Sequence, residues 1–276
     1  MDSVALAKAF AILAILGAGV LGGLLPWRVA RLSNSQTYLG WGNAFAGGVL
    51  LAAGLIHLLG DAASGFAAIW PNVDFPWAFT IAAGSFLLIL GLERVLPRTP
   101  RLPVGSVDTR DLIDPEADSI AEAALGSRQY PYLLLLTLSI HSLIAGMALG
   151  AQTSLAGFLI LLIAILAHKS AAGFSLGVSL QRIGVPIGRA RTLVLGFAVM
   201  TPLGVILGSL IAALLDSSGE QVFEALFDAI AAGTFIYIAS LDILREEFLP
   251  PREGRRIKWL FSAAGLTLMA LVAIWT

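Results

Sequence analysis

Apolar residues gather in eight blocks along the chain, and polar stretches separate each block from the next. The blocks are about 17 to 25 residues long, which is the length that crosses roughly 30 Å of hydrocarbon as an α-helix. They are residues 4–25, 41–60, 77–95, 132–151, 155–178, 193–215, 223–244 and 259–275. The pattern therefore predicts an all-α, polytopic membrane protein with eight transmembrane helices.

Composition and charge support this class. The 276-residue chain is 58% hydrophobic and 13% charged, whereas soluble proteins have about 25% charged residues. The net charge of −1 argues against a nucleic-acid partner, because phosphate binding needs a strongly basic surface. The chain has no cysteine, which excludes disulfides and thiolate metal sites. No basic segment precedes the first block, so we expect it to remain as a span rather than be cleaved.

The distribution of positive charge predicts the orientation. All but two of the 17 Lys and Arg residues lie in or beside the connections that follow the first, third, fifth and seventh blocks. The exceptions, Lys8 and Lys169, lie inside predicted spans. Cytoplasmic connections retain positive charge. We therefore expect both termini to face away from the cytoplasm, with the chain in a plasma or inner membrane.

Only the connection at about 97–130 is long and polar, and its charge places it in the cytoplasm. Asp114, Pro115 and Glu116 have the order of an N-cap, a first-turn proline and a first-turn acid, which predicts a short surface helix through Leu125. The rest is expected to be a solvated linker. Nothing indicates a second domain, so residues 1–276 are predicted to form a single transmembrane domain.

The three histidines, His57, His141 and His168, all lie inside predicted spans. Ionisable groups in a bilayer are costly, and they usually face a bundle interior and mark an ion path. Residues 132–151 and 155–178 should pack as an antiparallel pair, which brings His141 and His168 to one cavity halfway across the membrane. Neutral imidazole suits zinc and other transition metals better than magnesium or calcium. The sequence therefore predicts a metal site between these two helices.

Other polar residues in the spans are candidates for an ion pathway, each with an ordinary alternative. Ser175 continues a helical stripe of small residues from His168. Lys169 either lines the pathway or is a structural cation bonded to carbonyl groups or an acid. His57 and Asp61, four residues apart, form either an entry site or a simple hydrogen-bonded pair. Asp242, with Glu246 and Glu247, could receive the ion at the cytoplasmic end or belong to an interfacial charge cluster.

Five segments resemble the motifs of the ZIP family of divalent-metal transporters. They are residues 55–62 (LIHLLGDA), 139–150 (SIHSLIAGMALG), 168–177 (HKSAAGFSLG), 201–204 (TPLG) and 231–237 (AAGTFIY). The resemblance implies a ZIP-like bundle with alternating access and a metal site between the fourth and fifth helices. By matching position, His141, Ser142 and His168 would be site residues, and His57 and Asp61 would belong to the outer pathway.

The chain departs from the family pattern at two positions. Ala145 stands where the fourth-span motif has a metal-binding glutamate, and Ala172 where many members have a second carboxylate. Loss of both anions should weaken the binding of a divalent ion.

The sequence therefore predicts a transporter of a divalent metal, most readily zinc, which acts as substrate and not as cofactor, in a lipid bilayer. The oligomeric state stays open, with a homodimer as one arrangement. The alternatives are a transport-inactive sensor or assembly partner and an intramembrane zinc hydrolase.

Overall fold

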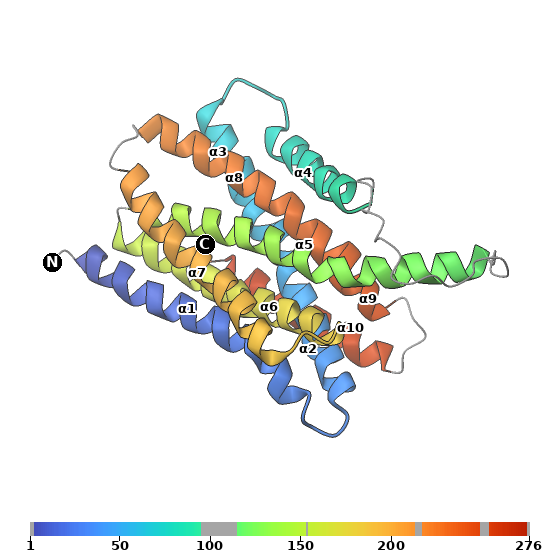
Figure 1. The fold of residues 1–276 in the computed structure, drawn as a ribbon. Helices are drawn as coiled ribbons and strands as arrows, with labels where there is room; N and C mark the ends of the chain where they lie inside the picture. Colours follow the sequence, from blue (N-terminus) through green and yellow to red (C-terminus); the bar gives the residue numbers. More distant parts are fainter. Residues whose placement is uncertain (1–2, 95–114, 153, 213–216, 249–253, 275–276) are drawn as a thin grey trace, which may run out of the picture.

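Long helices packed side by side make up the chain (Figure 1). The computed structural model describes residues 3–94, 115–152, 154–212, 217–248 and 254–274, and no residue in these ranges lies in a strand. The α-helices are α1 (Ser3–Val29), α2 (Ser35–Ala52), α3 (Leu59–Ile69), α4 (Trp77–Arg94), α5 (Pro115–Ala151), α6 (Leu155–Arg182), α7 (Ile187–Ile211), α8 (Ser217–Tyr237), α9 (Arg245–Phe248) and α10 (Arg255–Val272). The predicted all-α class is confirmed for these residues.

Length and apolar composition allow six segments of the described chain to cross a membrane. They are Leu6–Val29, Ser35–Ile69, Leu134–Ala151, Leu155–Arg182, Ile187–Ile211 and Gln221–Phe248. The apolar part of α4, Trp77–Leu92, is shorter, and α10 is not among the six. Over the described residues the eight predicted blocks are helical, apart from a turn at the ends of blocks 193–215 and 259–275. Membrane crossing by α4 and α10 stays a prediction.

Two of the long helices contain a π-helical segment, which the apolar pattern does not reveal. Segment η1 (Ala53–Leu58) joins α2 to α3, and η2 (Ile238–Leu244) joins α8 to α9. A π segment bulges the helix and changes the face on which the following residues lie, and such segments are frequent at functional sites. His57 lies in η1 and Asp242 in η2.

One sequence prediction is wrong. The helix that begins at Pro115 does not end near Leu125 but continues without a break to Ala151. Residues 116–125 are rich in alanine and glutamate, which are strong helix formers, so the helix extends from the apolar block instead of stopping at it. This end of α5 projects beyond the bundle (Figure 1). Residues 97–114 of the predicted linker, including Asp114, lie outside the described residues.

The helices pack in two groups. Helices α1, α5, α6 and α7 pack closely on one another, while α2 packs on α10 and α8 packs on α3 and α4. The groups meet chiefly where α2 lies along α6. Glycines permit the tightest contact: a Cβ at Gly146 of α5 would collide with the carbonyl of Thr201 in α7. Small residues in α5 thus allow α7 to approach closely.

Candidate metal site

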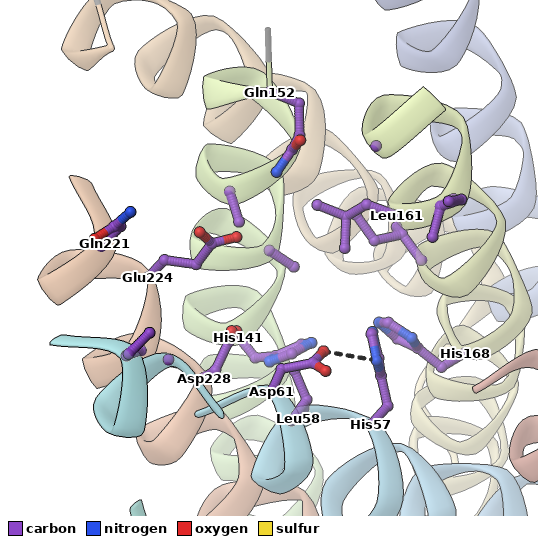
Figure 2. Close-up of a pocket in the computed structure, with 18 residues that line it drawn as sticks. His57, Leu58, Asp61, His141, Gln152, Leu161, His168, Gln221, Glu224 and Asp228 are labelled. Carbon is purple, nitrogen blue, oxygen red and sulfur yellow. Dashed lines mark ion pairs between the residues drawn. The ribbon is translucent and has the colours of Figure 1, made fainter. Parts of the chain in front are cut away.

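All three histidines of the chain line one cavity of about 470 Å³ (Figure 2). We call it the histidine cavity. His57 comes from η1, His141 from α5 and His168 from α6, so the cavity lies where the two helix groups meet. His141 and His168, which were predicted to reach one cavity, both line this one, and His57, which was predicted on the outer pathway, lines it as well.

The rings of His141 and His168 face each other across the end of the cavity. Their centroids are 5.6 Å apart with an angle of 60° between the planes, and the Phe235 ring lies 4.0 Å from that of His141. Only 5% of His141 is exposed, and neither of its ring nitrogens has a hydrogen-bond partner among the described residues. An unsatisfied buried polar group costs about 1–3 kcal/mol. His141 is therefore a buried polar group that no described side chain or backbone group satisfies.

His57 and Asp61 form an ion pair of 2.9 Å between Nδ1 and Oδ2. The His57 side chain is 5% exposed and that of Asp61 is 44% exposed, so the pair reaches from the buried end of the cavity toward its open part. The predicted contact between these residues is present. The contact with the carboxylate fixes the orientation of the His57 ring.

The cavity contains two carboxylates that the sequence prediction overlooked, Glu224 and Asp228 of α8. Figure 2 shows the Glu224 carboxylate turned toward α5. A signal was present, because two acids four residues apart within an apolar block lie on one face of a helix. This signal is weak in the sequence, because acids in the first turns of a span usually face the aqueous boundary.

Ser142 and Lys169 do not line the histidine cavity. The Lys169 ammonium donates hydrogen bonds to Ser142 Oγ (2.9 Å), Thr201 Oγ1 (3.0 Å) and the Phe197 carbonyl (3.2 Å). It also lies 3.7 Å from the centroid of the Phe197 ring. These partners belong to α5 and α7. The contacts match the predicted alternative of a structural cation that binds carbonyl groups.

The remaining candidates lie apart from the cavity. Ser175 is buried but is not part of the lining. Asp242 lines a separate, largely apolar cavity of about 210 Å³ between α4, α5 and α8, and His141 borders both cavities. Within the described chain, no group of three or more His, Asp or Glu side chains lies close enough together to hold a metal ion.

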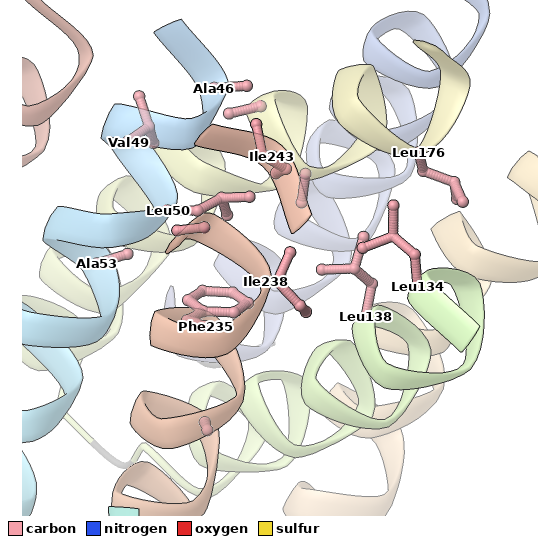
Figure 3. Close-up of a cluster of buried hydrophobic side chains, with 14 of the residues drawn as sticks. Ala46, Val49, Leu50, Ala53, Leu134, Leu138, Leu176, Phe235, Ile238 and Ile243 are labelled. Atoms are coloured by element: carbon pink, nitrogen blue, oxygen red, sulfur yellow. The ribbon is translucent and has the colours of Figure 1, made fainter. Parts of the chain in front are cut away.

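The polar lining ends at the histidines. Beyond them, toward the end of the bundle where α6 ends and α9 begins, the helices bury a cluster of apolar side chains (Figure 3). Phe235, Leu138 and Leu50 in this cluster are fully buried. In the other direction the cavity reaches Gln152, Gly157 and Gln221, at the end of α5 and near the beginnings of α6 and α8. The cavity therefore extends toward only one end of the bundle.

A second group of ionisable residues lies past the apolar cluster, and we call it the Glu247 cluster. The fully buried Glu247 carboxylate accepts hydrogen bonds from Arg182, Lys258 and Asn43, and Arg182 also lies 2.9 Å from Glu246. These residues come from α2, α6, α9 and α10. The cluster thus ties the two helix groups together at the end remote from the cavity mouth.

Comparison with known proteins agrees with the motifs. The model of the family described as ZIP zinc transporter matches residues 5–110 and 105–273. Zinc transporter ZIP1 of Danio rerio is 33% identical over 85% of this chain and 84% of that protein. Zinc transporter ZIP2 of Mus musculus is 29% identical over 83% and 82%. Zinc transporter 5 of Oryza sativa subsp. japonica is 29% identical over 97% and 86%. The chain therefore belongs to the ZIP family of zinc transporters, which are membrane proteins and not enzymes.

Proposed function

We propose that this chain transports a divalent cation, zinc, through the histidine cavity, with His141 and His168 as ligands and His57 and Asp61 on the approach. The observation that carries the proposal is the convergence of every histidine on one acid-lined cavity inside a bundle of apolar helices. Intramembrane ionisable groups that face such a cavity mark ion paths. We name zinc as the metal because the relatives that this chain resembles are zinc transporters.

The cavity mouth lies at the end of the bundle away from the arginine-rich connections. By the positive-inside rule, this end faces away from the cytoplasm, together with both termini. The cavity is then open to the outside, and the apolar cluster below the histidines closes the path to the cytoplasm. Transport requires a second arrangement of the two helix groups in which this cluster separates and the outer mouth closes.

A transport-inactive metal sensor remains the second candidate, because Ala145 lines the cavity where the family motif has a glutamate. A site with fewer anions binds a divalent ion more weakly, since carboxylate oxygens offset part of the cost of dehydrating the ion. Family membership removes the hydrolase alternative, because the matched family consists of transporters.

The test is zinc uptake into proteoliposomes. We expect His141→Ala and His168→Ala to lower uptake to the level of protein-free vesicles. Ser170→Ala is the matched control, because Ser170 lies on α6 near His168, bonds to the Leu166 carbonyl and is not part of the cavity. Equal uptake by all four chains would refute the proposal. Saturable zinc binding by the parent chain without any flux would favour the sensor.

A further inference from the structure

Three carboxylates line the histidine cavity. Its described lining contains Asp61, Glu224 and Asp228 but no lysine or arginine. Asp61 pairs with His57, and the other two acids lie on α8 and line the same cavity. A cavity with several carboxylates and no lysine or arginine attracts cations by its electrostatic potential.

The α5 wall of the cavity shows why these acids matter. Ala145 lies one helical turn after His141, and both residues line the cavity, as does Ala148. Small side chains at 145 and 148 leave the α5 wall without any anionic group beside the histidine. The Glu224 carboxylate is turned toward this wall (Figure 2). The carboxylate missing from α5 at position 145 thus has counterparts on α8, in the same cavity.

We propose that Glu224 and Asp228 supply the anionic ligands of the cation in the histidine cavity, with His141 as a nitrogen ligand. The inference rests on the proposed transport function and assigns its charged ligands to α8. Two features point to a ligand at this place: the pair of acids one turn apart, and the buried His141 ring, whose two nitrogens lack partners among the described residues. Zinc takes histidine nitrogen and carboxylate oxygen as ligands.

The spacing of these groups defines how the ion is held. They do not form a group compact enough to hold a metal ion by direct contacts alone. The cavity of about 470 Å³ has room for water as well as the ion. A cation in this state therefore keeps part of its water shell, and the carboxylates bind it partly through that water. Movement of α8 toward α5 would replace water with direct carboxylate contacts.

The experiment measures zinc binding to the purified full chain by isothermal titration calorimetry. We expect Glu224→Gln and Asp228→Asn to raise the Kd for zinc, and the double variant to raise it about tenfold or more, because charge-assisted contacts are lost. Asp74→Asn is the control, since Asp74 is exposed and lies outside the cavity lining. Adding Ala145→Glu to the double variant should restore binding, because it returns a carboxylate to the same cavity.

The outcomes separate this inference from the function on which it rests. If the double variant binds zinc as tightly as the parent while His141→Ala loses binding, the assignment to α8 is wrong and the histidine site stands. If neither the double variant nor His141→Ala weakens zinc binding, both the assignment to α8 and the proposed histidine site are wrong.

A measurement on the unmodified chain covers the case in which the variants do not fold. Zinc should protect Glu224 and Asp228, but not Asp74, from carbodiimide coupling read by peptide mass spectrometry. Equal labelling with and without zinc would overturn the assignment.

Discussion

His168 and Lys169 are neighbours in the chain and have opposite surroundings. His168 lines the cavity between the helix groups, whereas Lys169 points to α5 and α7, where two hydroxyls and a carbonyl accept its hydrogen bonds. Consecutive residues of an α-helix point about 100° apart, so one step along α6 separates the two environments. An ionisable residue in a membrane span therefore marks a functional site only when it faces open space.

The same contrast holds between the histidine cavity and the Glu247 cluster. Both contain buried ionisable side chains from both helix groups. In the Glu247 cluster each cation lies against an anion and the fully buried carboxylate has three donors. In the cavity, carboxylates and imidazoles surround a space whose described lining has no lysine or arginine. We infer that the cluster stabilises the bundle at the end remote from the cavity mouth, whereas the cavity is the proposed substrate site.

The largest effect on stability is expected for Glu247→Ala. Removal of one partner from a buried ion pair costs about 3–5 kcal/mol, because the remaining charge is left uncompensated. Here the stranded charge is that of Lys258, whose side chain is 6% exposed. Unfolding of the purified chain, followed by tryptophan fluorescence, measures the loss. Glu246→Ala is the matched control and should cost about 1 kcal/mol or less, since the Glu246 side chain is 37% exposed. Equal losses would contradict the distinction between the two acids.

The next effect tests whether Lys169 is structural. Lys169→Met removes charge-assisted hydrogen bonds while keeping the length of the side chain, and should lower the free energy of unfolding by about 1.5–3 kcal/mol. The Kd for zinc of the folded variant should not rise, because the ammonium lies outside the cavity and its removal takes a positive charge away from the neighbourhood of His168. A higher Kd for zinc without loss of stability would instead place Lys169 on the ion path.

A smaller effect is expected from a positive charge at the cavity mouth. Gln152 lines the cavity where α5 ends. In Gln152→Lys, repulsion between the ammonium and the ion should weaken zinc binding by about 1–2 kcal/mol. A unit charge and a divalent ion about 10 Å apart repel by about 3 kcal/mol at an effective dielectric constant near 20, and salt screens part of this at the cavity mouth. The change should appear as a higher half-saturating zinc concentration in uptake assays and should shrink as salt is raised. Gln152→Glu is the control and should shift the concentration the other way.

The apolar blocks were sufficient to locate the helices, since each block coincides with a helical segment over most of its described residues. It could not predict how far α5 extends, because the sequence before the block also favours a helix. The π segments η1 and η2 could not be predicted from the sequence either, since they depend on how the helix packs against its neighbours rather than on a local pattern.

The candidate site was predictable in part. Three histidines in spans were enough to suggest where the cavity lies, but not which way their neighbours face. Ser142 was expected in the site because its position matches the family motif, yet one step along the helix from His141 turns it to Lys169. Glu224 and Asp228 required knowledge of which α8 face meets α5, and this depends on tertiary packing.

The smallest effect is expected for Asp61→Asn. This change tests whether the exposed acid at the outer edge of the cavity contributes to zinc binding as strongly as the buried histidines. The change removes the charge that pairs with His57, but the Asp61 side chain is 44% exposed, so solvent screens much of the interaction. The half-saturating zinc concentration should rise by less than about fivefold, which corresponds to under about 1 kcal/mol. A loss of uptake as complete as that of His141→Ala would show that Asp61 is a direct ligand rather than part of the approach. An unchanged half-saturating zinc concentration would show that Asp61 does not attract the ion, so that the attraction comes from the α8 carboxylates alone.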